Sequence, residues 1–261
     1  SRRGASSPNE NPFMAIMRKD AVEDFGEVYG FSLVYSGNFK MLLEAETYGT
    51  MRFQAGVNPH NFKWKLNKGE QFITPELVMV YSKNGLGEMS RTFHRLYRRN
   101  LCRGIWRDKV RPILINNWEA TYFDFNEDKL INICKKASEL GIELFVLDDG
   151  WFGKRNNDKS SLGDWFVNTD KLPGSLKGLS EKVDKLGMSF GLWVEPEMIS
   201  EDSDLFRKHP DWALRIQGRE MHEGRNQYVL DMGRDDVVAY LTDVFTAVLG
   251  SADIKYIKWD M

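Results

Sequence analysis

Two charged residues interrupt the apolar run at the end of the chain. Residues 256–261 are apolar and aromatic except for Lys258 and Asp260. Because side chains alternate across a strand, a strand here places these two on one face and Ile257 and Trp259 on the other. Burying an unpaired charge is costly, so the pair is either a structural ion pair or a reactive site. In a reactive site Asp260 would be a nucleophile at the end of a strand, and Lys258 would keep its carboxylate ionised.

Carboxylates and indoles also follow three earlier apolar runs. The full set is Trp118, Asp148, Asp149, Trp151, Trp193, Glu195, Glu197, Lys258 and Asp260. Each has an ordinary explanation alone: Asp-Asp-Gly is often a turn, Glu-Pro-Glu can cap a following helix, and tryptophans are usually core. Their recurrence at four successive strand ends favours a functional site. Carboxylates and indoles without a histidine cluster suit glycoside hydrolysis, although three or four carboxylates could instead hold Mg²⁺.

These residues would be positioned by strands that alternate with amphipathic helices. The predicted strands are 113–115, 144–147, 190–194 and 256–261, with helices near 126–140, 179–186 and 235–249 between them. Such alternation predicts parallel strands buried on both faces. We expect the first half of a (β/α)₈ barrel, whose active sites form at the carboxyl ends of the strands and which needs about 250 residues when complete. A doubly wound sheet usually carries a glycine-rich phosphate turn after its first strand, where this chain has Asn116, Asn117 and Trp118.

The first hundred residues have a different pattern. Short apolar runs separated by turn residues predict an antiparallel β-sandwich, with strands at 31–35, 41–43, 51–53, 62–66 and 77–81. A helix is expected from Gly87 to about Leu101, with arginines on its solvated face. Because no second basic patch accompanies it, this face does not indicate a nucleic-acid site. We place the domain boundary within 104–112, so that the domains are 1–105 and 106–261.

Composition narrows the possible partners and compartment. A chain of 261 residues with 42% hydrophobic residues and a net charge of −2 is typical of a soluble globular protein, without nucleic acid or an anionic membrane as partner. No signal peptide or membrane span is expected. Cys102 and Cys134 have no metal or redox spacing, so we expect unpaired thiols in a reducing, cytoplasmic setting.

The strand-end motifs resemble those of the bacterial α-galactosidases of glycoside hydrolase family 36. The motifs that carry the resemblance are residues 115–120, 147–152, 192–198 and 256–261. Residues 9–13 and 54–59 are similar to the end of that family's N-terminal β-sandwich. The resemblance covers essentially the whole chain. It implies the C-terminal part of a β-sandwich followed by the first half of a TIM barrel.

The resemblance also implies an activity and site residues. The activity is that of a retaining exo-α-galactosidase on terminal α-linked galactose, as in melibiose or raffinose-type sugars, without a cofactor or metal. Asp260 matches the nucleophile of the double displacement. The implied sugar contacts are Asp148 and Asp149 on hydroxyls O4 and O6, Lys258 and Arg225 as cations, and Trp118 and Trp193 as aromatic walls of the pocket.

The family's general acid/base is an Asp that would lie past Met261, so we expect this chain alone to be inactive. Glu195 and Glu197 are nearer carboxylates, for which orienting or capping roles are expected. The complete enzyme is expected to be a homo-oligomer, as the tetrameric members of the family are. Three alternatives stay open: a galactosyl transferase similar to plant raffinose synthases, a non-catalytic sugar-binding module, and a Mg²⁺-dependent barrel enzyme.

Overall fold

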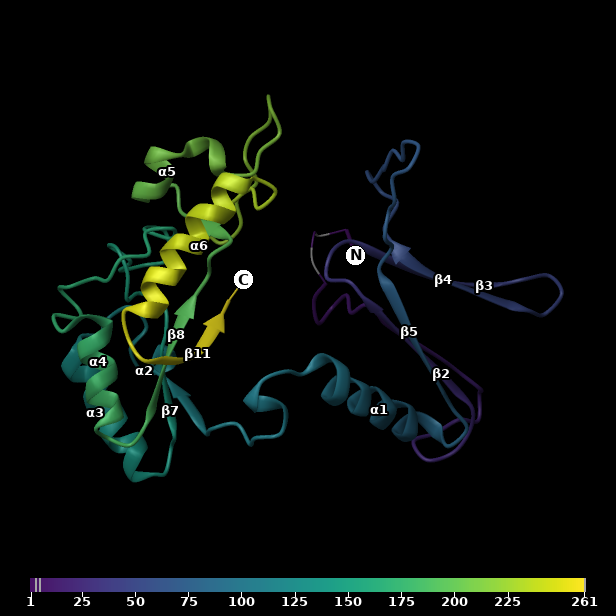
Figure 1. Cartoon of the computed structure of the whole chain (residues 1–261), viewed down its shortest axis with the longest axis horizontal. Helices are drawn as coiled ribbons and strands as arrows, with labels where there is room; N and C mark the ends of the chain where they lie inside the picture. Colours follow the sequence, from purple (N-terminus) through teal and green to yellow (C-terminus); the bar gives the residue numbers. More distant parts are fainter. Residues whose placement is uncertain (3, 5, 261) are drawn as a thin grey trace. The chain divides into compact units, whose positions relative to one another are not determined.

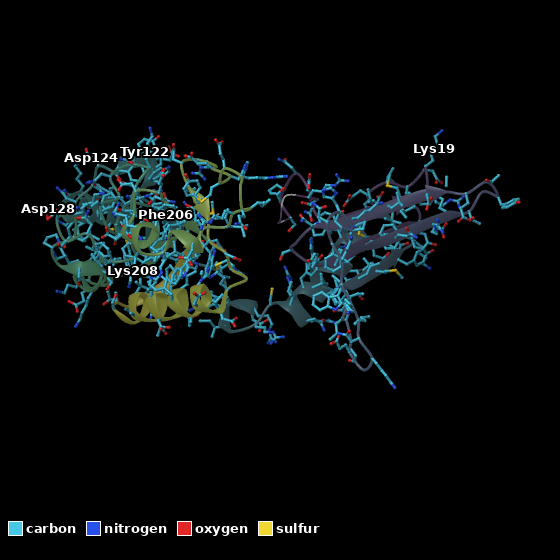
Figure 2. All side chains as sticks on the ribbon, turned by 90° about the horizontal axis from the view of Figure 1, so that it is seen from above. Lys19, Tyr122, Asp124, Asp128, Phe206 and Lys208 are labelled. Atoms are coloured by element: carbon cyan, nitrogen blue, oxygen red, sulfur yellow. The ribbon has the colours of Figure 1, made fainter. Side chains whose placement is uncertain are left out.

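The chain folds into two compact units. The structure is a computed structural model that describes residues 1–2, 4 and 6–260. The units are Ser1–Val110 and Arg111–Met261 (Figure 1). Charged side chains such as Lys19, Asp128 and Lys208 are exposed on the outside of the units (Figure 2).

The N-terminal unit is built from antiparallel strands. Strands β1 (Phe13–Met17), β2 (Val28–Val34) and β5 (Glu76–Ser82) form a sheet in the order β1-β2-β5, and β3 (Phe39–Ala45) pairs with β4 (Met51–Val57) as a separate hairpin. Helix α1 (Gly85–Leu96) packs on the sheet through Met89 and Phe93, both buried. The helix lies so close to β2 that a side chain at Gly30 would overlap Met89 and Phe93, because a Cβ there would be 2.7 Å from each.

One sequence-based expectation for this unit is wrong. Residues 62–66 alternate like a strand, but the structure gives them no regular secondary structure and leaves them exposed. Alternation produces a strand only where a partner supplies backbone hydrogen bonds and one face is buried; here the aromatic side chains pack locally, with the Trp64 and Phe72 rings 5.0 Å apart. The helix expected from Gly87 to about Leu101 is present: α1 continues without a break into a π-helical segment, Tyr97–Leu101.

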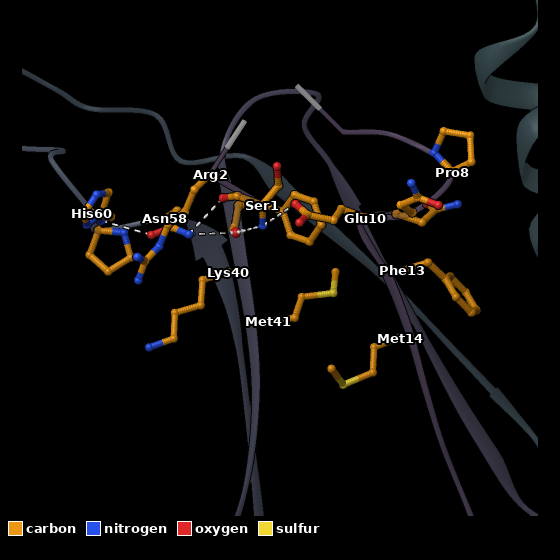
Figure 3. Close-up of a pocket in the computed structure, with 14 residues that line it drawn as sticks. Ser1, Arg2, Pro8, Glu10, Phe13, Met14, Lys40, Met41, Asn58 and His60 are labelled. Carbon is orange, nitrogen blue, oxygen red and sulfur yellow. Dashed lines mark hydrogen bonds and ion pairs between the residues drawn. The ribbon is translucent and has the colours of Figure 1, made fainter. Parts of the chain in front are cut away.

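The two N-terminal motifs meet at a pocket of this unit. Residues 9–11 and 58–60 line a cavity of about 820 Å³, which Figure 3 shows in close-up. The Asn58 side chain is 8% exposed and donates from Nδ2 to the carbonyl oxygens of Ser1 and Phe39, at 2.9 and 3.2 Å. The motifs therefore have at least a structural role, because they join the start of the chain to β3.

The C-terminal unit contains a parallel four-stranded sheet. Its strands are β6 (Leu114–Asn116), β7 (Leu144–Leu147), β8 (Ser189–Val194) and β11 (Ile254–Trp259), and they lie in chain order. Each successive pair is connected through one long helix, namely α3 (Glu127–Glu139), α4 (Ser175–Asp184) and α6 (Asp235–Gly250) (Figure 1). Sequential parallel strands with helical crossovers are the pattern of a (β/α)₈ barrel. The half barrel is confirmed, and so are the predicted sandwich strands other than residues 62–66.

Local signals account for the helix ends. The Asn126 side chain accepts a hydrogen bond from the Lys129 amide at 3.0 Å, as expected of an N-cap. After α3 the chain turns at Gly141, whose φ of 80° favours glycine. The short α5 (Asp204–Lys208) is capped by Ser203, which accepts from the Phe206 amide at 3.0 Å. The capping role considered for Glu195 and Glu197 is therefore wrong.

Shorter elements lie between the main ones. They are α2 (Trp118–Thr121), the 3₁₀ turns Ile105–Arg107 and Pro210–Trp212, and the two-stranded pair β9 (Met198–Ile199) and β10 (Tyr228–Val229). No helix in the part of the chain that the structure describes is long and apolar enough to cross a membrane.

The last strand is less buried than its sequence suggests. Strand β11 lies at one end of the sheet and, among the residues that the structure describes, pairs with β8 alone, so Trp259 is 60% exposed and the Lys258 side chain 36%. Met261, the last residue of the 256–261 motif, lies outside the described residues. The strand at the opposite end of the sheet is β6, so within residues 1–2, 4 and 6–260 the sheet has an unpaired edge on both sides, as expected of half a barrel.

Candidate active site

An ion pair connects the ends of two strands. The Lys258 Nζ on β11 donates to the Asp148 Oδ2, just past β7, at 2.8 Å. Asp148 is 2% exposed, and its other oxygen accepts from the Asp149 amide at 2.9 Å. The sequence-based hypothesis paired Lys258 with Asp260; in the structure the ammonium forms an ion pair with a carboxylate 110 positions earlier. The buried charge of Asp148 is thus compensated.

Asn117, at the end of β6, holds the backbone of the same residue, Asp148. Its side chain is fully buried and its Oδ1 accepts from the Asp148 amide at 2.9 Å, while its Nδ2 donates to the Thr121 Oγ1. Three strand ends, β6, β7 and β11, are therefore connected through Asp148. The signal for Asn117 was its place next to Trp118 after an apolar run.

Asp260 is held by a neutral donor. The Trp193 Nε1 donates to the Asp260 Oδ2 at 3.0 Å. The Asp260 amide donates to the Val194 carbonyl oxygen at 2.8 Å, which extends the pairing of β11 with β8. The hydrogen bond from Trp193 fixes the Asp260 carboxylate in place. Because Asp260 is only half-buried, it is still accessible to a ligand.

Trp193 is itself held in the core. It is 3% exposed, its ring lies parallel to that of Phe152 at 6.1 Å between centroids, and its carbonyl oxygen accepts from the Trp151 Nε1 at 2.9 Å. Its indole N–H is directed at Asp260. Trp118, on α2, is half-buried and packs edge-to-face on Tyr122 and Phe123.

Asp149 is bound by an arginine that the sequence analysis missed. The Arg155 Nε lies 3.1 and 3.2 Å from the two Asp149 oxygens, and its Nη2 lies 2.9 Å from Oδ2. Arg155 and Asp149 are 2% and 6% exposed. Burial raises the pKa of the Asp149 carboxyl above its ordinary value, although the hydrogen bonds and charge of Arg155 oppose this. Arg155 lies in a loop rather than at a strand end, and for this reason the pattern of strand ends in the sequence did not indicate it.

Lys171 fixes the loop that carries Arg155. Its Nζ donates to the carbonyl oxygens of Gly150 and Arg155, at 2.9 and 3.0 Å, and lies over the Phe125 ring. Burial lowers the pKa of Lys171 to about 8. The two ends of the turn after Asp149 are thus tied to one ammonium group.

Glu195, just past β8, is the fourth carboxylate of the cluster. It is 2% exposed, and its Oε1 accepts from the Gln227 Nε2 at 2.6 Å. Burial raises the pKa of Glu195, which the Gln227 hydrogen bond partly offsets. Arg225, two residues before Gln227, is exposed. Glu197 differs: its carboxylate accepts from the Trp259 Nε1 and so holds β11 to the segment after β8.

The cluster offers a positioned carboxylate, a compensated acid–lysine pair and indole groups, which together can bind hydroxyls and attack an electrophilic carbon. A retaining glycosidase needs a second carboxyl about 5–5.5 Å from its nucleophile. Across residues 1–2, 4 and 6–260, no three or more His, Cys, Asp or Glu side chains are grouped so that they could hold a metal ion.

Comparisons with known proteins give matches along the whole chain. Residues 71–261 match the Melibiase family and residues 1–67 match the glycosyl hydrolase family 36 N-terminal domain. The chain is 60% identical to alpha-galactosidase AgaA of Geobacillus stearothermophilus and 51% identical to alpha-galactosidase Mel36A of Lactobacillus acidophilus, in each case over 100% of this chain and 36% of the relative.

A crystal structure of a Geobacillus stearothermophilus AgaA variant in complex with raffinose superimposes on this chain. Its TM-score is 0.98 at 60% identity, and the match covers all of this chain and 36% of that one. The chain therefore spans about a third of the length of the relatives that it matches.

Proposed function

The chain belongs to the Melibiase family, and we propose that it is part of a retaining exo-α-galactosidase that hydrolyses terminal α-linked galactose. Melibiose and raffinose-type sugars are the proposed substrates, since a relative with 60% identity binds raffinose. The observation that carries the proposal is the position of Asp260: Trp193 holds its carboxylate at the end of β11, a strand whose Lys258 pairs with Asp148.

In the proposed mechanism Asp260 attacks the anomeric carbon. A bond forms between its carboxylate oxygen and C1 while the bond to the glycosidic oxygen breaks, and that oxygen leaves with a proton from a general acid. We assign this acid to an Asp in the part of the enzyme past Met261. Water, deprotonated by the same residue, then attacks C1 of the β-galactosyl-enzyme and releases Asp260, so that the α-configuration is retained.

The remaining residues bind the sugar. We propose that Asp148 and Asp149 accept hydrogen bonds from the O4 and O6 hydroxyls, since carboxylate oxygens have lone pairs beyond those that Lys258 and Arg155 use. Lys258 and Arg225 donate to sugar oxygens. Trp118 forms an aromatic wall of the pocket, as does Trp193, which also orients Asp260 through its N–H.

The test uses the complete enzyme and 4-nitrophenyl α-galactoside. Proton NMR of the first product should show α-galactose before mutarotation, and 2,4-dinitrophenyl α-galactoside should yield a hexose adduct that peptide mapping places on Asp260. Initial release of β-galactose, or an adduct on another residue, would overturn the proposal.

We propose further that the complete enzyme is a cytoplasmic homo-oligomer, a tetramer. The family resemblance supports the assembly, and the free thiols of Cys102 and Cys134 support a reducing compartment. Light scattering coupled to size exclusion should give the mass of four subunits; a monomer mass would refute this assembly.

A further inference from the structure

Arg225 lies in a strained two-residue turn. Residues 224 and 227 exchange both backbone hydrogen bonds, from the Gly224 amide at 3.1 Å and from the Gln227 amide at 3.2 Å. Between them Arg225 and Asn226 have φ angles of 55° and 61°, which define a type I′ turn. Asn tolerates this left-handed conformation, whereas Arg is uncommon there. The surrounding structure must hold such a residue in place.

The residues that directly follow the turn help to hold it in place, in addition to a hydrogen bond of 3.4 Å from the Asn226 Nδ2 to the Asp158 Oδ2. Gln227 is 5% exposed, and its Nε2 donates to the buried Glu195 Oε1 at 2.6 Å. The next two residues form β10, in which Tyr228 pairs with Ile199 and Val229 with Met198 of β9. Both contacts connect the turn to the segment directly after β8, which is the edge of the sheet where Asp260 lies.

The charges around Glu195 make the donor at position 227 important. Asp260 at the end of β11, Arg225 on the turn and Arg155 after β7 all act on the Glu195 carboxylate through space. Gln227 adds a hydrogen bond without adding a charge. Without this donor the Glu195 Oε1 would lose its hydrogen-bond partner. Glu195 is 2% exposed, and an unsatisfied buried acceptor is costly, so we expect the turn to rearrange.

We propose that Gln227 is a positioning residue: its hydrogen bond to Glu195 fixes the 224–227 turn so that Arg225 reaches the bound sugar. The proposal rests on the α-galactosidase activity and the Arg225 contact proposed above. Because Arg225 would bind the sugar in the ground state as well as in the transition state, a misplaced turn raises KM more than it lowers kcat.

The experiment is a double-mutant cycle in the complete enzyme. We compare Gln227→Leu, Arg225→Ala and the double variant, with 4-nitrophenyl α-galactoside as substrate. Gln217→Leu is the control, because Gln217 is exposed in the segment that leads to the same turn. Loss of one buried hydrogen bond should raise KM about ten-fold in Gln227→Leu and change kcat less than about three-fold. In the Arg225→Ala background Gln227→Leu should raise KM by less than about a further two-fold, because the two residues act as a unit. Gln217→Leu should match the wild type.

Gln227→Glu covers the case in which the leucine variant does not fold. It keeps the shape of the side chain, and two adjoining carboxyls can share one proton at low pH but repel each other when both ionise. Its KM should therefore be close to that of the wild type near pH 5 and rise more steeply toward pH 8. A pH dependence of KM equal to that of the wild type would overturn the proposal.

Further outcomes separate this inference from the proposed function. Independent, multiplicative effects of Gln227→Leu and Arg225→Ala, or a fall in kcat alone, would also overturn the positioning role. A complete wild-type enzyme that releases no galactose would instead refute the α-galactosidase activity itself.

Discussion

Removal of the Arg155 guanidinium tests how the site tolerates the buried charge of Asp149. Three N–H···O contacts of 2.9 to 3.2 Å bind both carboxylate oxygens, and the two side chains are 3% and 9% exposed. Arg155→Met in the complete enzyme leaves the carboxylate in place without its partner. Breaking a buried pair in this way costs about 3–5 kcal/mol, and we expect a loss of that size in local stability at pH 7.5.

The loss should depend on pH in a defined direction. The pKa of Asp149 is already raised by burial, and without Arg155 it rises further above the unfolded value of about 3.9. Between the unfolded and the folded pKa the folded state holds more protons, so stability falls as pH increases through this window and is constant above it. Protonation of Asp149 as the pH falls should reduce the cost toward about 1 kcal/mol, that of an ordinary hydrogen bond.

Amide hydrogen exchange measured by mass spectrometry reports this cost for residues 148–160, after correction for the intrinsic exchange rate at each pH. Arg207→Met is the matched control, since Arg207 pairs with Asp202 and Asp204 on the exposed surface and its loss should change little. Equal losses at pH 5 and pH 7.5, or a loss no larger than that of the control, would refute the reasoning.

Three further changes test other parts of the site in the complete enzyme. Asp260→Asn should reduce turnover of 4-nitrophenyl α-galactoside to the assay background, and substantial residual hydrolysis would remove Asp260 from the nucleophile role. Lys258→Met leaves the buried Asp148 without its cation and should lower kcat/KM at least about ten-fold, whereas Lys255→Met, on the same strand but exposed, should not; equal effects would count against the ion pair. Glu127→Ala removes the carboxylate that accepts from the Gly174 amide, just before α4, and that pairs with Lys182. We expect a lower melting temperature with an unchanged KM, and a changed KM would contradict a purely structural role.

Local sequence determined the elements and the edge at which the site forms. Asn126 caps the helix expected near 126–140, and the chain turns at Gly141, because each of these signals acts within one turn of the backbone. The carboxyl ends of parallel strands lie at one edge of the sheet. Sequence order alone was therefore enough to group Asp148, Glu195 and Asp260.

Only the tertiary structure decided which groups become partners. The pairing of Lys258 with Asp148, of Arg155 with Asp149 and of Gln227 with Glu195 depends on the spacing of adjacent strands and on loop geometry. A one-dimensional pattern contains neither quantity. The same limit explains residues 62–66, whose alternation is real but lacks a paired strand among the described residues. Side-chain type follows from the sequence; the partner of a buried charge follows from which strands the fold places beside it.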